Sequence, residues 1–309
     1  MRLRLAVAAM LPVLALAACG TSTSSQEAGP TRTVKHAMGE TKVPMTPKRV
    51  VVLDTDKLDS MVSLGLAPVG AAQASQNQKW PAYLGSALSA TKAVGTTQAP
   101  NIEAIMALQP DLILGSKFRQ AAFYDKLSKI APTVFTEKVG ITWKENFLLD
   151  AEALGKKDQA QQLLSTYEAR AKEVGAKFSK LKVSIVRFMP TEIRMYGPES
   201  FSGIVVGDAG IQRPEVQQLA GQADKRFGKL SQENIAQADG DAIFYTAYGE
   251  AAVKSQATVT GGPLWKNLGA VKSNNAHNVD DEIWMTGIGV TAAGKILDDL
   301  DKYLTPLAS

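Results

Sequence analysis

The stretch that decides the fold is residues 144–178, KENFLLDAEALGKKDQAQQLLSTYEARAKEVGAKF. It contains no proline, and its apolar residues recur at intervals of three and four, the period of a helix that buries one face. Because Gly155 interrupts this pattern, the stretch predicts either one long, bent helix or two abutting helices. A helix of this length in mid-chain is a candidate connector between two lobes, and we assign residues 143–181 to it.

Before this connector, short apolar strands alternate with helices. Residues 49–54 (RVVVLD) are a β-branched run of the kind that forms a strand buried on both faces of a sheet. The region opens with short extended segments that turn at Gly39. The alternation predicts an α/β lobe with a largely parallel sheet over residues 34–142. Its further strands are expected at 68–71, 111–114 and 132–135, and its helices at 57–64, 101–108 and 119–129.

The same alternation resumes after the connector. About 290 residues remain once a leader is removed, which is more than one core usually serves. The predicted fold is therefore α/β, with a second α/β lobe over residues 182–309 joined to the first by the long helix. Its strands are expected at 182–187, 193–196, 241–245 and 276–279, and its helices at 201–208, 232–238 and 290–304.

The two lobes contain matching segments. NIEAI at 101–105 and SQENI at 231–235 each place a capping residue two positions before a glutamate and an aspartate eight positions after it. Asn and Ser are favourable N-caps, and a glutamate in the first turn suits the helix dipole. Capping explains each segment by itself. It does not explain why both lobes carry an acid, Glu103 and Glu233, at one matching corner, so a shared functional role stays open.

The first 33 residues are predicted to be a leader and a tether. Residues 1–18 combine two arginines, an uncharged apolar run and small final residues, as in a secretory signal peptide. The run is too short to cross a bilayer comfortably as a helix. It is followed by Cys19, the only cysteine, in the lipobox pattern of bacterial lipoproteins, where the cysteine receives lipid. The small, polar residues 19–33 then form a flexible tether, which places the protein on the outer face of the cell membrane.

Composition argues against several function classes. Without residues 1–18 the chain has 32 basic and 30 acidic side chains, a balance that does not indicate a nucleic-acid-binding surface. No later segment is long and apolar enough to span a membrane. Two histidines, His36 and His277, are too few for a zinc site, so neither metal ligands nor a resident cofactor is predicted. A surface hydrolase is not favoured because the sequence has no Gly-x-Ser-x-Gly elbow and no recognisable triad.

Six segments, taken together and in this order, resemble one known family over nearly the whole mature chain. That family is the iron-siderophore substrate-binding lipoproteins of bacterial ABC importers. The resemblance implies two lobes with a ligand cleft between them, limited hinge motion through the connecting helix, and a receptor that is not an enzyme. The segments are PKRVVVLD (47–54), APNIEAIMALQPDLILGSKFR (99–119), YDKLSKIAPTV (124–134), IRMYGPESF (193–201), LWKNLGAVK (264–272) and DEIWMTGIG (281–289).

The resemblance also implies the partners. Receptors of this family dock on the permease subunits of the importer through one acidic residue on each lobe, and Glu103 and Glu233 fall at those positions. Because exposed charge pairs are individually weak, their expected value is register and orientation on a two-fold partner. The receptor is expected to be a monomer held at the membrane through lipid on Cys19.

Three arginines are predicted to contact the ligand. A ferric siderophore already coordinates its iron, so the protein has to supply apolar surface and a few donors aimed at the iron-bound oxygens. Arginine suits this task because it is always charged and donates in a fork. Arg119, Arg187 and Arg194 lie near strand ends, where α/β lobes hold ligands. Arg187 shares a strand face with apolar residues, so its charge has to be paired or reach an open cleft. A solvated or ion-paired surface role is the alternative for each.

Aromatic residues are the other ligand candidates. Trp284 is the first choice because it lies in a loop before the last helix that often lines the cleft in this family. Trp80 lies in a polar loop where a large apolar side chain has no obvious core role. A buried structural position is the commoner place for any single aromatic residue. The complete set of candidates is Trp80, Phe118, Tyr196, Tyr248 and Trp284.

The sequence leaves the ligand class and the coupling to transport open. Hydroxamate chelates such as ferrioxamines are the first choice because three arginines and several aromatic residues suit a weakly charged complex. Ferric citrate-like carboxylate siderophores are second, because carboxylate-binding relatives also place an arginine at the position of Arg119. Catecholates, haem and cobalamin are less favoured. A ligand-sensing lipoprotein that does not feed a transporter is the alternative to an importer subunit.

Overall fold

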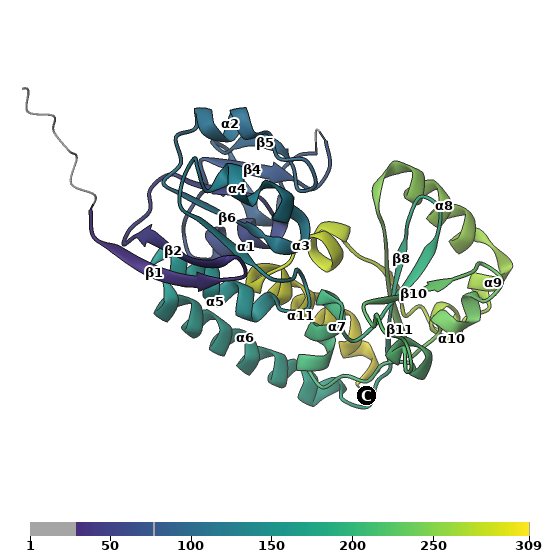
Figure 1. Ribbon diagram of the computed structural model, residues 1–309. Coiled ribbons are helices and arrows are strands. Elements are labelled where there is room, and N and C mark those ends of the chain that lie inside the picture. Colours follow the sequence, from purple (N-terminus) through teal and green to yellow (C-terminus); the bar gives the residue numbers. More distant parts are fainter. Residues whose placement is uncertain (1–28, 77, 309) are drawn as a thin grey trace, which may run out of the picture.

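A computed structural model describes residues 29–76 and 78–308 and shows two α/β lobes connected by long helices. The amino-terminal lobe lies above one end of these helices and the carboxyl-terminal lobe stands at the other end (Figure 1). The predicted fold class is therefore confirmed. The predicted signal peptide and the lipidation residue Cys19 lie outside the described residues. No helix within the described ranges is both long enough and apolar enough to cross a membrane.

The described chain begins with an antiparallel hairpin of β1 (Thr31–His36) and β2 (Gly39–Pro44). The predicted turn at Gly39 is confirmed, and this glycine has a φ of 124°, which side chains rarely adopt. The hairpin joins the first lobe because the Ala37 amide donates to the carbonyl of Phe135 at 2.9 Å. Because strand pairing starts at Thr31, the prediction that the tether extends to residue 33 is wrong.

The first lobe contains a five-stranded, entirely parallel sheet in the order β5-β4-β3-β6-β7. Its central strand β3 is Val-Val-Val and is buried on both faces, as the β-branched pattern predicts. The strands are β3 (Val50–Val52), β4 (Gly70–Gln73), β5 (Lys92–Thr96), β6 (Leu112–Ser116) and β7 (Thr133–Thr136). The helical elements are α1 (Thr55–Ser63), η1 (Ala82–Leu88), α2 (Ile102–Ala107), α3 (Lys117–Gln120), η2 (Ala121–Phe123) and α4 (Tyr124–Leu127).

The helix predicted at 119–129 is three short pieces, α3, η2 and α4. The break lies at Gln120, whose backbone leaves the helical region at φ −116° and ψ 15°. Its buried side-chain amide donates to the carbonyls of Leu53, at 3.1 Å, and Thr97, at 2.6 Å. These long-range bonds fix Gln120 against the sheet, and local helical periodicity gives no sign of them.

The predicted connector is two abutting helices, α5 (Trp143–Leu154) and α6 (Lys157–Phe178). Gly155 separates them in the left-handed conformation, with φ 72° and ψ 30°. A side chain there would be strained, and its Cβ would lie 2.8 Å from the carbonyl oxygen of Met45. The alternative of one bent helix is excluded, and the connector ends at Phe178 rather than at 181.

The second lobe contains a five-stranded mixed sheet in the order β10-β9-β8-β11-β12. Strands β8, β11 and β12 run parallel, and β9 and β10 are antiparallel additions at one edge. The helix predicted at 232–238 is a short 3-10 turn over its second half. The strands are β8 (Val183–Phe188), β9 (Ile193–Tyr196), β10 (Phe227–Leu230), β11 (Ala242–Ala247) and β12 (Ala276–Asn278). The helical elements are α7 (Phe201–Asp208), η3 (Glu215–Gln218), η4 (Ile235–Ala238), α8 (Gly249–Gly261), α9 (Pro263–Lys266) and α10 (Gly269–Lys272).

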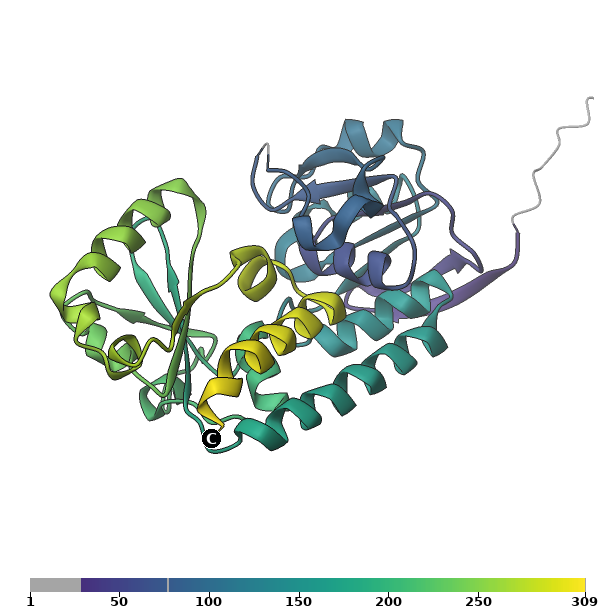
Figure 2. The ribbon, with the colours of Figure 1, turned by 180° about the vertical axis from the view of Figure 1, so that it is seen from behind.

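After β12 the chain runs back to the first lobe while it stays packed on the second, through Trp284 on Phe244 and through contacts with α7. A π-helical turn η5 (Glu282–Thr286) leads into α11 (Val290–Leu304), which lies alongside α6 and ends in the turn η6 (Thr305–Leu307) (Figure 2). The buried carboxylate of Asp59 on α1 accepts the amides of Thr291 and Ala292 at the start of α11, both at 3.0 Å. The assignment of residues 182–309 to the second lobe is incomplete for the segment after 281, because this segment contacts α1 of the first lobe as well as α7 and Phe244 of the second. We call 282–304 the return segment.

Candidate functional site

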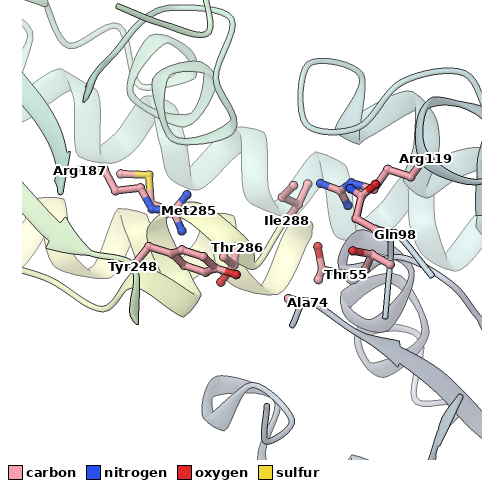
Figure 3. A pocket seen from close by; sticks show the side chains of 10 residues that line it. Thr55, Ala74, Gln98, Arg119, Arg187, Tyr248, Met285, Thr286 and Ile288 are labelled. Atoms are coloured by element: carbon pink, nitrogen blue, oxygen red, sulfur yellow. The ribbon is translucent and has the colours of Figure 1, made fainter. Parts of the chain in front are cut away.

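A cavity of about 340 Å³ lies between the two lobes. Arg187 and Tyr248 approach it from the second lobe, and Thr55, Gln98 and Arg119 approach it from the first (Figure 3). These residues follow or end strands β3, β5, β6, β8 and β11, so the carboxyl ends of both sheets meet here. The return segment forms the wall between the lobes. The remaining lining residues are Ala74, Thr97, Met285, Thr286 and Ile288.

Arg119 reaches this cavity from α3, directly after β6. Its Nη1 is paired with Oδ1 of Asp54, a carboxylate with no exposed surface at the end of β3. Asp54 is itself held by the hydroxyl of Ser116, at 2.9 Å, and by the amide of Thr55, at 2.8 Å. The guanidinium is therefore positioned by fully buried groups, while about a quarter of its side chain, 23%, stays exposed toward the cleft.

Behind Asp54 lies a buried group of charges that reaches the connector. The ammonium of Lys57, on α1, is 3.0 Å from a carboxylate oxygen of Asp56 and 3.2 Å from one of Asp150 on α5. Burial lowers the pKa of Lys57, but these carboxylates outweigh it and raise that pKa, so the lysine stays charged. Burial raises the pKa of Asp54 and of Asp150. The carboxylate that holds the cleft arginine thus interacts electrostatically with a buried group of charges that includes Asp150 of the connector, without a direct ion pair to it.

Arg187 reaches the cavity from β8 in the second lobe, and it is both paired and open to the cleft. Its Nε and Nη2 donate to the two carboxylate oxygens of Asp281 at 2.7 and 2.5 Å, which is a bidentate geometry. Its Nη1 donates to the hydroxyl of Tyr196 at 3.3 Å, and its guanidinium lies 4.7 Å from the ring centre of Tyr248. The sequence predicted that the charge of Arg187 is either paired or open to the cleft, and in the structure it is both.

Arg194 does not line this cavity. Its Nε donates to Oε1 of Glu192 at 2.6 Å, and its guanidinium stacks 4.1 Å from the ring centre of Phe227. The alternative of an ion-paired residue therefore describes Arg194 in this structure, and its contact with ligand stays a prediction. Tyr196 is half-buried and acts on the cleft through Arg187 rather than by lining it.

The aromatic candidates have different surroundings. Tyr248 lines the cavity, whereas Trp284 has no exposed surface, stacks on Phe244 with ring centres 4.7 Å apart, and donates its indole N–H to Asp299 at 2.8 Å. The prediction that Trp284 lines the cleft is wrong because this tryptophan points into the core, where it packs between the return segment and β11. Its neighbours Met285 and Thr286 line the cavity instead.

Trp80 and Phe118 lie at the margins of the cleft. Trp80 is half-buried and borders a narrow crevice together with Thr55 and Thr286, which also line the main cavity. Phe118 is 58% exposed and lines a second cavity beside the first. Ligand contact by either residue stays a prediction.

The matching segments of the two lobes have related but not identical structures, an α-helix in the first lobe and a 3-10 turn in the second. Glu103 lies in the first turn of α2, where Asn101 accepts the amide of Ala104 at 2.9 Å, and Glu233 lies in the turn before η4. Both glutamates are exposed. The aspartates that follow bind backbone: Asp111 accepts the amides of Lys48 and Arg49 at 2.7 and 2.9 Å, and Asp241 accepts that of Lys182 at 2.7 Å. The aspartates therefore have a structural role that the glutamates lack.

The sequence analysis missed most of the polar lining. The missed residues on the first lobe follow β3, β4 and β5, so the strand-end rule could have found them, whereas the others lie in or directly after η5. It also missed the carboxylates that hold the arginines, because Asp281 lies 94 positions from Arg187. Within residues 29–76 and 78–308, no three His, Cys, Asp or Glu side chains form a group that could hold a metal ion. The missed lining residues are Thr55, Ala74, Thr97, Gln98, Met285, Thr286 and Ile288.

Comparison with known proteins agrees with this geometry. The profile of the family described as "Periplasmic binding protein" matches residues 50–282. The chain is 40% identical over 309 residues to the probable siderophore-binding lipoprotein YfiY of Bacillus subtilis, covering 95% of each. It is 29% identical to the Fe(3+)-citrate-binding protein YfmC of the same organism, covering 95% of this chain and 94% of that protein. The solved structure of Staphylococcus aureus SirA complexed with staphyloferrin B is similar at a TM-score of 0.79, with 36% identity, covering 89% of this chain and 98% of that one.

Proposed function

Because the chain belongs to the periplasmic binding protein family, we propose that it captures a ferric siderophore outside the cytoplasmic membrane and delivers it to an ABC importer. The relatives named as siderophore-binding lipoproteins support this assignment, and the lipobox at Cys19 would hold the receptor at the membrane. No catalytic step is part of the proposal. Iron enters as cargo, coordinated by the siderophore.

The observation that carries the proposal is the pair of arginines facing one cavity from opposite lobes. Arg119 and Arg187 are each fixed by an aspartate, so their remaining N–H donors are preorganised toward the cleft. A ferric chelate presents anionic oxygens in several directions around the metal. Donors on both walls therefore bind opposite sides of the complex and favour approach of the lobes.

The cavity suits an anionic, carboxylate-bearing chelate better than a weakly charged one. Its lining includes two guanidinium groups and the polar side chains of Thr55, Gln98 and Thr286. Among the lining residues only Tyr248 is aromatic. With Trp284 in the core and Arg194 paired, the aromatic surface that favoured hydroxamates is smaller than the sequence suggested. We therefore favour the second ligand class of the sequence analysis, carboxylate siderophores, over the first.

A binding panel tests this proposal. The purified mature receptor is titrated calorimetrically with ferric citrate, ferric staphyloferrin B and ferrioxamine B, and each iron-free chelator serves as a control. We expect the carboxylate chelates to bind at least about tenfold more tightly than ferrioxamine B, which is a difference of about 1.4 kcal/mol. Tighter binding of ferrioxamine B would restore the hydroxamate class, and binding of no ferric chelate would overturn the proposed function.

Docking on a permease is the second part of the proposal, and it rests on the exposed glutamates of the matching segments. Replacing both by lysine, Glu103→Lys with Glu233→Lys, should abolish uptake of the ferric chelate while the affinity for it stays within twofold, because neither residue lines the cleft. Glu173→Lys, at an exposed glutamate of α6, is the matched control. Unchanged uptake by the double variant would favour the sensor alternative over the importer subunit.

A further inference from the structure

A second cavity of about 310 Å³ also lies between the lobes. Phe118 and the segment 138–141 line it from the first lobe, and Glu199, Asp224 and Arg226 line it from the second. Phe118 is 58% exposed, which is unusual for a large aromatic side chain that has no partner in a core. The guanidinium of Arg226 lies 6.0 Å from the centre of its ring, so the two lobes already approach each other here.

The second cavity continues the main cleft on both walls. On the first lobe, Phe118 and Arg119 are consecutive residues of α3 and line the second and the main cavity respectively. On the second lobe, Arg226 is followed by Phe227, whose ring lies 5.9 Å from that of Tyr196. The hydroxyl of Tyr196 in turn accepts from Arg187 in the main cavity. One groove between the lobes therefore contains both spaces.

The two spaces differ in chemistry. In the main cavity two guanidinium groups face the ligand. In the second cavity Phe118, Val139, Ile141 and Ala223 supply apolar surface, and its one guanidinium, of Arg226, is paired with Asp224 at 2.8 Å, both of which line that cavity.

Two polar side chains complete the second cavity, Lys138 and Glu199. Neither has an ion-pair partner within 4.0 Å in the described part of the chain. Such a lining suits an uncharged chain that carries hydrogen-bonding groups, such as amides, at intervals along a hydrocarbon.

We infer that the second cavity binds the uncharged organic arm of the siderophore while the main cavity binds its iron-bearing, anionic end. This inference rests on the proposed function. At about 340 Å³ the main cavity is at the lower limit for a drug-sized ligand, and the second cavity nearly doubles the enclosed space. Phe118 and Ile141 then determine which arms are accepted, so selectivity among chelates with similar iron centres resides outside the main cavity.

Affinity measurements on Phe118→Ala test the inference with two kinds of ligand. Ferric citrate has no arm beyond its iron-binding groups, whereas ferric staphyloferrin B and ferrioxamine B are larger. We expect the variant to lose about tenfold in affinity for whichever larger chelate the parent binds, and to bind ferric citrate within twofold of the parent. Phe118→Leu, which keeps an apolar side chain, should recover most of the loss.

The matched control is Leu264→Ala on α9, a residue that is also exposed, at 49%, and that lines neither cavity. It should change no affinity. An equal loss for citrate and the larger chelate, or no loss at all in Phe118→Ala, would overturn the inference, and so would a parent that binds ferric citrate alone. A parent that binds no ferric chelate would instead contradict the proposed function itself.

Discussion

The two lobes each present one arginine to the cleft, and they hold it in different ways. In the first lobe Arg119 is paired with Asp54, which is completely buried just after the carboxyl end of β3 and lies near the charges around Lys57. In the second lobe Arg187 is paired with Asp281, whose side chain is 15% exposed and lies on the strand-free segment where the chain leaves that lobe. The first wall is therefore set by the fold of its own lobe, and the second depends on a segment that connects the lobes.

Asp281 and Glu282, where the chain passes from the second lobe toward the first, show how the second wall depends on the connecting segment. Asp281 binds Arg187 of the second lobe, while the carboxylate of the next residue, Glu282, accepts the amide of Ala82 in the first lobe at 2.9 Å. Two consecutive side chains thus bind to different lobes.

The largest expected effect comes from breaking the buried charges of the first wall. Lys57→Met leaves the carboxylates of Asp56 and Asp150 buried without their cation, and removal of one partner of such a group costs about 3–5 kcal/mol. Urea unfolding at neutral pH measures this loss. Lys172→Met on the exposed face of α6 is the control. A loss below about 1 kcal/mol would show that the carboxylates take up protons at little cost and that this wall is less rigid than we describe.

The second prediction concerns Asp59, the first-lobe carboxyl that binds the start of α11, and the pH dependence of the stability that it contributes. Burial raises the pKa of Asp59 to about 6, from an ordinary value of 3.8. Between these values the folded state binds more protons than the unfolded one, so this carboxyl contributes stability below about pH 4 that is lost as the pH rises through 6.

A comparison with Asp59→Asn isolates this contribution. The unfolding free energy of the parent minus that of Asp59→Asn should fall by up to about 3 kcal/mol between pH 4 and pH 6.5, and then stay level. Urea titrations across this range provide the measurement. A pH-independent difference would mean that folding does not raise the pKa of Asp59.

The third prediction concerns ligand affinity and separates the two walls directly. Arg119→Ala and Arg187→Ala should each weaken binding of an anionic ferric chelate by about 2 kcal/mol, because each removes charged donors from the cleft. Arg119→Ala should also lower the unfolding free energy, because it leaves Asp54 buried and unpaired, whereas Arg187→Ala should lower it less because Asp281 is partly exposed. Calorimetry and urea unfolding give the two readouts. Equal stability losses would contradict the difference between the walls.

The smallest expected effect is at Arg194, which the sequence placed beside Arg187. Since its guanidinium pairs with Glu192 and stacks on Phe227, Arg194→Ala should change chelate affinity by less than twofold and stability by at most about 1 kcal/mol. Titration of the same ferric chelate tests this. A tenfold weaker complex would mean that Arg194 exchanges its partner for the ligand when the lobes close.

Local patterns predicted the centre of each sheet because those strands are buried apolar runs, and they predicted the last helix because its apolar residues have a clear helical period. The centre of the first sheet, Val50–Val52, and the last helix, Val290–Leu304, lie close to where periodicity placed them. The errors occur where distant contacts override the local pattern. Gln120 leaves the helix because it binds carbonyls on two other segments, and the return segment joins the first lobe through Asp59, more than 200 positions earlier.

The site was predictable only in part, for the same reason. The strand-end rule found Arg119 and Arg187 because the position of a strand end is a local property. Trp284 was misplaced because the burial of a tryptophan depends on Phe244 and Asp299, and their proximity arises from the packing of α11. The roles of Glu103 and Glu233 stay predictions, since their partner would be another molecule.

The hairpin at the start of the described chain determines where a pull on the amino terminus would act. Strands β1 and β2 are fastened to the first lobe, where Arg32 donates to the carbonyl of Glu152 on α5 at 2.7 Å and Thr41 donates to that of Thr133 at 3.2 Å. Tension applied at Thr31 would therefore load the first lobe and the start of the connector before it reached the second lobe.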